Sequence, residues 1–145
     1  MDLYAIYLVS DSVGETADVV IRSALYQFET ENYQLKKYSY VQTTEEIDDI
    51  CAKAAEDEKA MIFYTFVKKE MADYMKSRIE HSNLIGVDIY SPILTGLGQL
   101  FQLPAKEKPG MNRQLNEDYF NRVEAIEFSV KYDDGRDPRG IEKAD

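Results

Sequence analysis

Apolar runs of strand length alternate with segments of helical spacing along most of this chain. The first run, Tyr4 to Val9, is short, partly β-branched and aromatic, and bounded by turn residues, which predicts a strand buried on both faces. After this run the apolar residues recur at steps of three or four, which predicts a helix with one apolar stripe. The members of the stripe are Val13, Ala17, Val20, Ile21, Ala24, Leu25 and Phe28.

The same alternation continues to about residue 101. Strands are predicted over 33–41, 60–67 and 84–90, and helices over 43–57, 69–80 and 91–101. The helix residues expected to face the core are Ile47, Ile50, Cys51, Ala54, Ala55, Met71, Ala72, Met75 and Ile79. In the fourth helix one apolar face is formed by Ile93, Leu94, Leu97, Leu100 and Phe101. The pattern predicts an α/β domain over residues 1–103, Rossmann-like or flavodoxin-like, with three layers and a mostly parallel sheet of about four strands. Both common strand orders of such sheets stay open.

Capping residues mark the predicted helix starts. Ser12 with Glu15 has the spacing of a capping box, and so has Thr43 with Glu46. Ser91 is the expected cap of the fourth helix, because proline follows it at the first helical position.

Small polar residues follow the first predicted strand. Ser10, Ser12, Gly14 and Thr16 surround the expected helix start, where unpaired N–H groups and the helix dipole stabilise an anion. Two interpretations stay open at this point. The segment is either a phosphate-binding loop or an ordinary turn and cap of a strand–helix unit.

After residue 103 the alternation stops. A loop follows with Pro104, Pro109 and Gly110, and it carries the basic residues Lys106, Lys108 and Arg113. A last helix is predicted from about residue 116, and residues 104–132 are expected to pack on the same domain. The apolar face of this last helix consists of Tyr119, Phe120, Val123, Ile126 and Val130.

Composition restricts the class of partner and the compartment. The chain has 145 residues, 44% of them hydrophobic, which suits one globular domain with its own core. Its 17 Lys and Arg against 27 Asp and Glu give a net charge of -10, which opposes binding to nucleic acid or anionic lipid. No membrane-spanning or signal-peptide pattern is present, so a cytoplasmic location is expected.

Two residue types occur once. Cys51 cannot form an internal disulfide, and its position on an apolar helix face predicts core packing rather than reactivity. His81 lies at a predicted helix end, where a favourable last-turn cation is the expected role.

The tail of the chain combines turn formers with charged residues. Asp134-Gly135 and Asp137-Pro138 favour a solvated loop. The same segment supplies Arg136 and Arg139, whose guanidinium groups suit the binding of phosphate. The carboxylates of Asp133, Asp134 and Asp137 suit the binding of a metal ion or the acceptance of a proton. Both interpretations stay open from the residues alone.

The front loop and the tail together resemble one protein family. Val9-Ser-Asp-Ser-Val-Gly-Glu-Thr-Ala17, the segment from Asp118 to Gly140 and the intervening Lys108-Pro-Gly-Met-Asn-Arg113 are similar to the regulatory proteins of pyruvate phosphate dikinase and phosphoenolpyruvate synthase. The resemblance implies a bifunctional enzyme. Such an enzyme phosphorylates a threonine of the dikinase or synthase with ADP as the phosphoryl donor. It also transfers that phosphoryl group to inorganic phosphate, which releases pyrophosphate.

The resemblance also implies a division of the protein. In the family a strand and a Walker-type GxxxxxK[ST] loop follow the segment that matches residues 141–145, and residues 1–145 contain no such loop. We therefore expect an N-terminal domain, with 133–145 as a linker toward a P-loop kinase-like domain. The chain by itself is expected to be inactive, and ADP, phosphate and Mg²⁺ are expected to act only in the intact enzyme.

Site residues follow from the resemblance as hypotheses. The predicted catalytic residues are Asp11, Asp133 and Asp134, and no metal ligand is assigned. The residues expected to face phosphate or nucleotide are Ser10, Ser12, Gly14, Thr16, Arg113, Arg136 and Arg139. Lys108 is a weaker candidate. The expected partner is the dikinase or the synthase, and a homodimer is the default oligomer.

Two other functions stay open. The loop from Ser10 to Thr16 also approximates the flavin-phosphate loop of flavodoxins. The domain is alternatively a noncatalytic module that docks the target and leaves the chemistry to another domain.

Overall fold

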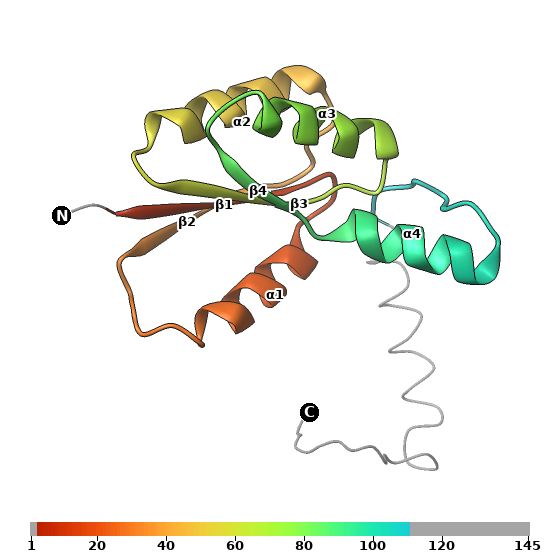
Figure 1. The fold of residues 1–145 in the computed structure, drawn as a ribbon, viewed down its shortest axis with the longest axis horizontal. Helices are drawn as coiled ribbons and strands as arrows, with labels where there is room; N and C mark the ends of the chain where they lie inside the picture. Colours follow the sequence, from red (N-terminus) through yellow and green to blue (C-terminus); the bar gives the residue numbers. More distant parts are fainter. Residues whose placement is uncertain (1–2, 111–145) are drawn as a thin grey trace, which may run out of the picture. The chain divides into compact units, whose positions relative to one another are not determined.

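Four parallel strands and four helices alternate in the computed structural model, which describes residues 3–110 (Figure 1). The predicted last helix and the charged tail lie outside these residues. The elements are β1 (Tyr4–Ser10), α1 (Glu15–Leu25), β2 (Tyr33–Tyr38), α2 (Thr44–Glu56), β3 (Ala60–Thr65), α3 (Lys69–Glu80), β4 (Ile85–Asp88) and α4 (Tyr90–Phe101). The predicted α/β class with a four-strand parallel sheet is confirmed.

The strand order is β2-β1-β3-β4, and every neighbouring pair is parallel. The chain moves from β1 to one side for β2 and then to the other side for β3. This order is that of the flavodoxin-like sheets and not that of the Rossmann sheets, which resolves the alternative left open by the sequence. Because all strands run the same way, the loops that follow them meet at one edge, the carboxyl edge.

The hydrophobic core lies between the sheet and the pair α2 and α3. Tyr7 and Val9 from β1 and Ile62 from β3 are at most 1% exposed, and the helices contribute the side chains predicted from their periodicity. Those helix residues are Ile47, Ile50, Cys51, Ala54, Met71, Ala72, Met75 and Ile79. The prediction for Ala55 is wrong, because it lies on the outer side of α2 and is exposed. At β4, Gly86 permits close packing against α3, since a Cβ there would collide with the side chain of Ile79.

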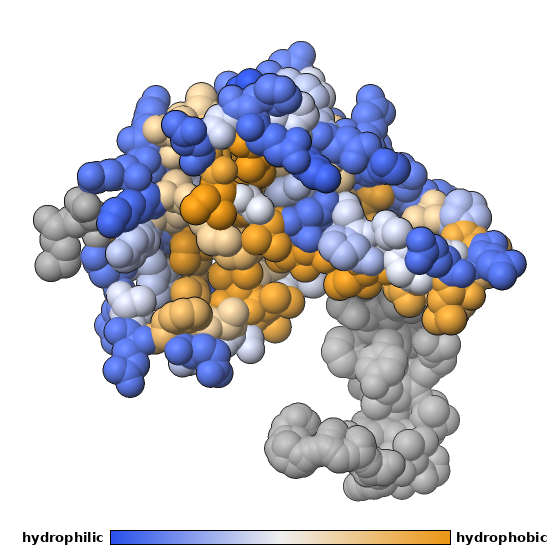
Figure 2. Space-filling model, in the orientation of Figure 1, coloured by the Kyte–Doolittle hydropathy of each residue, from blue (hydrophilic) through white to orange (hydrophobic). Residues whose placement is uncertain are grey.

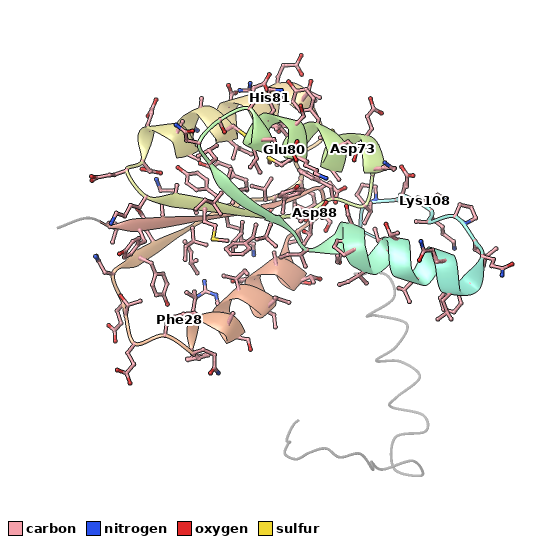
Figure 3. The ribbon with its side chains drawn as sticks, viewed as in Figure 1. Phe28, Asp73, Glu80, His81, Asp88 and Lys108 are labelled. Atoms are coloured by element: carbon pink, nitrogen blue, oxygen red, sulfur yellow. The ribbon has the colours of Figure 1, made fainter. Side chains whose placement is uncertain are left out.

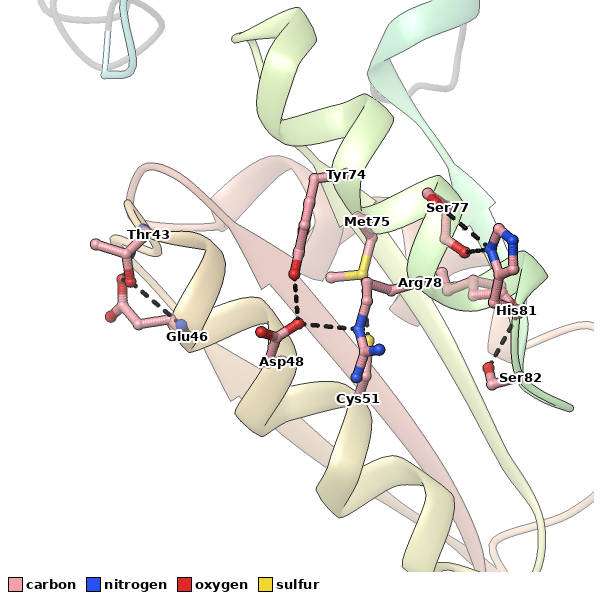
Figure 4. Close-up of polar contacts among 11 residues, drawn as sticks. Thr43, Glu46, Asp48, Cys51, Tyr74, Met75, Ser77, Arg78, His81 and Ser82 are labelled. Atoms are coloured by element: carbon pink, nitrogen blue, oxygen red, sulfur yellow. Dashed lines mark hydrogen bonds and ion pairs between the residues drawn. The ribbon is translucent and has the colours of Figure 1, made fainter.

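Polar contacts join α2 and α3 at their surface (Figure 4). The Asp48 carboxylate accepts a hydrogen bond from the Tyr74 hydroxyl at 2.8 Å and pairs with the Arg78 guanidinium at 2.9 Å. The predicted core position of Cys51 is confirmed, with its Sγ 3.8 Å from Met75 Sδ. The last turn of α3 ends at His81 as predicted, and its ring Nδ1 lies 2.7 Å from the Ser77 carbonyl oxygen.

The capping predictions have different outcomes. Thr43 and Glu46 form the predicted capping box of α2, with each side chain bonded to the other's backbone N–H. The prediction for Ser91 is wrong, because α4 begins one residue earlier and the carboxylate of Asp88 accepts the Ser91 N–H at 2.9 Å. A strand-end carboxylate thus reaches the first turn of α4 in place of the serine.

The second face of the sheet is covered less completely. In α1 only Ala17 and Ile21 are buried, whereas Val20 of the predicted stripe is 45% exposed. Phe28 lies beyond the end of α1 and is exposed (Figure 3). The helix predicted over 91–101 is confirmed as α4, and none of its residues is buried. Apolar side chains consequently gather at the surface between the sheet, α1 and α4 (Figure 2).

No helix among residues 3–110 combines the length and the apolar character that crossing a bilayer requires.

Candidate functional site

The loops after β1 and β3 meet at the carboxyl edge, at the point where the strand order reverses. Sheets of this type commonly bind ligands at such a point, because the helices that follow the two neighbouring strands lie on opposite faces of the sheet. The segment from the end of β1 to the first turn of α1 contains five residues predicted to belong to the site, Ser10, Asp11, Ser12, Gly14 and Thr16. The register pairs Ser10 of β1 with Thr65 of β3, and both are 2% exposed, so the two strands end side by side.

The loop after β1 is held by its own hydroxyls and by the segment after β2. The Ser12 N–H donates to Ser10 Oγ at 3.0 Å, and the two hydroxyl oxygens are 3.3 Å apart. The Ser12 carbonyl accepts the Tyr40 N–H at 2.8 Å, and the Val13 carbonyl accepts the Ser39 hydroxyl at 2.7 Å. These bonds explain why the predicted Ser12–Glu15 capping box is wrong. Ser12 lies two residues before the cap residue Gly14, and its backbone is hydrogen-bonded to the segment after β2.

Gly14 is the cap residue of α1 and has a left-handed backbone, with φ 90° and ψ 17°. Only glycine adopts this conformation without cost. A Cβ at Gly14 would also lie 3.2 Å from Cε of Lys37, on the neighbouring strand β2. No side chain of the described residues caps α1, so its first N–H groups are not satisfied by a local carboxylate or hydroxyl.

Asp11 joins the loops after β1 and β3. Its carboxylate is 3% exposed and accepts the Val67 N–H, from the loop after β3, at 2.9 Å. Burial raises the pKa of Asp11, against the lowering effect of hydrogen bonds from the Val67 and Lys68 backbone and of the Lys68 charge. The carboxylate predicted to be catalytic is therefore placed as a buried tie between β1–α1 and β3–α3.

Residues that the sequence did not single out also reach this edge. The Tyr90 hydroxyl donates to Thr16 Oγ1 at 3.3 Å, which connects the start of α4 with the first turn of α1. Asp88 is the last residue of β4 and lies at the same edge (Figure 3). Burial raises the pKa of the Tyr64 hydroxyl, and the charge of Asp88 raises it further. The one sequence signal for these residues is their position directly at a strand end.

The loop from Leu103 to Gly110 returns to the start of α3. The Glu107 carboxylate accepts the Lys69 N–H at 3.3 Å, so an acidic residue of this loop occupies the positive end of the α3 dipole. Lys106 and Lys108 flank Glu107 and are exposed. This loop therefore brings the weaker candidate Lys108 to the same end of α3 that Asp11 joins through Val67.

The remaining predicted site residues, Asp133, Asp134, Arg113, Arg136 and Arg139, lie outside the described residues. Within residues 3–110, no three His, Cys, Asp or Glu side chains gather closely enough to hold a metal ion. We therefore assign no Mg²⁺ ligand in this part of the chain.

The arrangement favours binding an anion over proton transfer. The polar groups of the first loop are already hydrogen-bonded to each other, which holds the loop rigid, whereas the α1 N–H groups point past a residue with no side chain. Asp11 is oriented toward backbone amides and buried, so it serves as a positioning residue in this conformation.

Comparison with known proteins identifies the family of the chain. A profile described as "Kinase/pyrophosphorylase" matches residues 6–145. The protein from Alkaliphilus oremlandii (strain OhILAs) is 42% identical over 140 residues, which cover 97% of this chain and 50% of that protein. The Bacillus subtilis (strain 168) protein is 45% identical over 142 residues, covering 97% of this chain and 52% of that protein. Both are named "Putative pyruvate, phosphate dikinase regulatory protein". The chain spans about half the length of the curated relatives it matches.

Proposed function

This chain belongs to the kinase/pyrophosphorylase family, and we propose that it forms the N-terminal part of an enzyme that regulates pyruvate phosphate dikinase by reversible phosphorylation. In one direction the β-phosphoryl group of ADP passes to a threonine hydroxyl of the dikinase, and AMP leaves. In the other, inorganic phosphate takes the phosphoryl group from the phosphothreonine, and pyrophosphate leaves. The family match over residues 6–145 carries the proposal, and the names of the relatives support the dikinase as the target.

The role proposed for residues 3–110 is to supply one wall of the phosphate site. The backbone N–H groups at the start of α1 bind phosphoryl oxygens, because the side chains of Ser10 and Ser12 are used within the loop. Asp11 keeps the loops after β1 and β3 in register. The tail residues Asp133, Asp134, Arg136 and Arg139 are proposed to face the nucleotide half of the intact enzyme, and the nucleotide loop itself belongs to that half.

A chimera tests the proposal directly. Residues 1–145 replace the matching half of the full-length Bacillus subtilis relative, and transfer from ADP labelled at the β-phosphate is measured on the dikinase and, separately, on phosphoenolpyruvate synthase. We expect a labelled phosphothreonine on the dikinase and its release as pyrophosphate when phosphate is added. Absence of transfer to either target by a folded chimera, while the unmodified relative is active, contradicts the proposal.

Two glycines provide a matched test of the wall. Gly14 and Gly110 both have a positive φ, 90° and 88°, so an alanine at either position carries similar backbone strain. Only Gly14 lies at the start of α1. In the chimera, Gly14→Ala is expected to reduce transfer at least about tenfold, a loss of about 1.4 kcal/mol in transition-state binding, whereas Gly110→Ala retains it. If both substitutions reduce phosphate transfer equally, the role proposed for the loop after β1 is contradicted. The proposal of the family activity does not depend on that result.

The isolated chain distinguishes the alternatives. Residues 1–145 contain no GxxxxxK[ST] sequence, and we expect neither ADP binding by calorimetry nor phosphate transfer by this chain alone. A yellow complex with flavin mononucleotide favours the flavodoxin-like function. Capture of the dikinase by the isolated chain, together with unchanged transfer in Gly14→Ala, favours a docking role.

A further inference from the structure

Thr65, the last residue of β3, has a buried hydroxyl without a partner among residues 3–110. The residue is 2% exposed, and its Oγ1 forms no hydrogen bond with any described residue. Side chains alternate between the two faces of a strand, and the preceding Tyr64 belongs to the core beneath α2 and α3. Thr65 therefore points to the face of α1. An unpaired buried hydroxyl costs free energy and indicates a partner from outside the fold, such as a ligand oxygen.

The position of Thr65 brings this hydroxyl to the candidate site. Thr65 is paired in register with Ser10, whose own hydroxyl already accepts the Ser12 N–H at 3.0 Å. Helix α1 packs on β1 and β3, and it starts at the same edge of the sheet at which β3 ends. Of the two neighbouring buried hydroxyls, only that of Thr65 is therefore available to a ligand at the start of α1.

Lys37 approaches the start of α1 from β2. Its Cε lies so close to Gly14 that a Cβ there would be 3.2 Å away. The Lys37 ammonium is 3.7 Å from the Asp18 carboxylate, whereas the Arg22 guanidinium is 2.5 Å from the other oxygen of the same carboxylate. Arg22 is thus the closer partner of Asp18. The Lys37 ammonium is only loosely paired and can turn toward another anion.

The charges in the first turn of α1 explain why a cation is needed at this site. Glu15 and Asp18 lie in that turn, and their carboxylates repel a phosphoryl group. Arg22 offsets the charge of Asp18, and Lys37 adds a further positive charge beside Gly14, which has no side chain to separate the ammonium from the α1 N–H groups. An ammonium, a hydroxyl and backbone N–H groups all donate hydrogen bonds, as phosphoryl oxygens require.

We propose that Lys37 and Thr65 bind the phosphoryl group held at the start of α1, with the ammonium donating from the side of β2 and the hydroxyl from the side of β3. This inference rests on the phosphate-binding role proposed above for the loop after β1, and it adds two side chains to the backbone donors. The ligand is a phosphoryl group with about two negative charges, either inorganic phosphate or the phosphothreonine of the target. Both residues act by binding, and neither exchanges a proton.

A titration of the isotope-labelled 145-residue chain with inorganic phosphate tests the role of Lys37. Sodium chloride keeps the ionic strength constant, and nuclear magnetic resonance follows the amides of Glu15, Thr16 and Ala17. We expect saturable shifts of these amides, and Lys37→Gln should raise the dissociation constant at least about fivefold. Lys36→Gln should leave it unchanged.

Lys36 is a matched control because it neighbours Lys37 on β2 but points to the opposite face. Its ammonium is 3.5 Å from the Asp57 carboxylate, and its side chain is 31% exposed, against 39% for Lys37. The two substitutions therefore remove the same charge and a comparable ion pair. The absence of saturable shifts in the wild type, or an equal loss of affinity in both variants, overturns the proposal.

Thr65→Val tests the hydroxyl separately, because it replaces the hydroxyl by a methyl group of similar size. We expect phosphate binding to weaken at least about threefold, while the midpoint of urea denaturation without phosphate stays the same or rises. A hydroxyl with a purely structural role predicts the reverse, a lower midpoint with unchanged phosphate binding. That result overturns the role of Thr65.

The chimera distinguishes the two sources of the phosphoryl group and separates this inference from the proposed function. If inorganic phosphate occupies the site, Lys37→Gln should raise the KM for phosphate at least about fivefold in the pyrophosphate-forming direction. If the phosphothreonine occupies it, the KM for phosphorylated dikinase should rise instead. An active chimera in which Lys37→Gln changes neither KM overturns this inference alone, whereas an inactive unsubstituted chimera contradicts the proposed function.

Discussion

The two faces of the sheet are built from similar sequence patterns but differ in how completely they are covered. On the α2 and α3 face, every helix residue predicted to point inward except Ala55 is buried, and ties such as the one between Tyr74 and Asp48 join the two helices at the surface. On the face of α1, only two helix residues are buried, and α4 buries none. The first face provides the stability of the domain. The second leaves apolar side chains exposed within residues 3–110.

A pair of identical substitutions tests this contrast with the largest expected effect. Ile47 on α2 is fully buried, and Ile93 on α4 is 53% exposed. Ile47→Ala is expected to lower the free energy of unfolding by about 2–5 kcal/mol, because it removes packed methyl groups and leaves a cavity. Ile93→Ala should change it by no more than about 0.5 kcal/mol. Urea denaturation measures both, and comparable losses contradict the difference between the faces.

The buried tie at the crevice has the next largest expected effect. Asp11→Ala removes the acceptor of the Val67 N–H inside the protein, which costs about 1–3 kcal/mol of unfolding free energy. Asp11→Asn keeps a carbonyl oxygen at that position and should cost less. Hydrogen exchange reports the mechanism, because the Val67 amide should lose protection in Asp11→Ala before the amides of α2 do. If Val67 stays protected, Asp11 does not hold the second loop.

The next test compares Ser12 and Thr43, the two hydroxyl residues of the predicted capping boxes. Thr43→Ala removes an observed cap and is expected to cost about 1 kcal/mol. Ser12→Ala removes a hydroxyl that does not cap α1 and that bonds only to Ser10, so the expected loss is below about 0.5 kcal/mol. Thermal unfolding of the two variants measures the difference. A larger loss for Ser12→Ala means that the loop after β1 supports the fold more than α2 does.

The smallest expected effect is a pH dependence at the covered face. Hydrogen bonds from the Gln42 and Thr43 backbone hold the pKa of Glu46 below its ordinary value of 4.5. The unfolded chain therefore binds this proton more tightly, so the stabilisation is fully present above pH 4.5 and is lost as the pH falls through the lower folded-state pKa. The carboxylate is exposed, so we expect about 0.5 kcal/mol or less.

Glu46→Gln is the control for this pH dependence. Its unfolding free energy should be flatter than that of the wild type across the acidic range, measured by urea denaturation at several pH values. Asp11 acts in the opposite direction, since its raised pKa makes the folded state gain relative stability as the pH falls toward its ordinary value of 3.8. Parallel curves for Glu46→Gln and the wild type contradict the role of this carboxylate.

Local sequence information predicted the elements better than the site. The strands, the helix α3 and the box of Thr43 and Glu46 depend on residues within a few positions of each other, and all are confirmed. The tie between Asp11 and Val67 joins residues 56 positions apart, and no local pattern indicates it. Ser12 has the spacing of a cap, but a neighbouring segment engages its backbone through Tyr40. The spacing of a capping box is therefore necessary and not sufficient.

The sequence by itself determined the alternation of strands and helices, the apolar side of each helix and the family, because each of these is a property of residue order. Only the tertiary structure decided the strand order, the meeting of the Asp11 and Val67 loops, and which apolar sides became core. An apolar stripe indicates that a surface avoids water and does not specify what covers it. For α2 the cover is α3 and the sheet, whereas the equally apolar stripe of α4 remains exposed within the described residues.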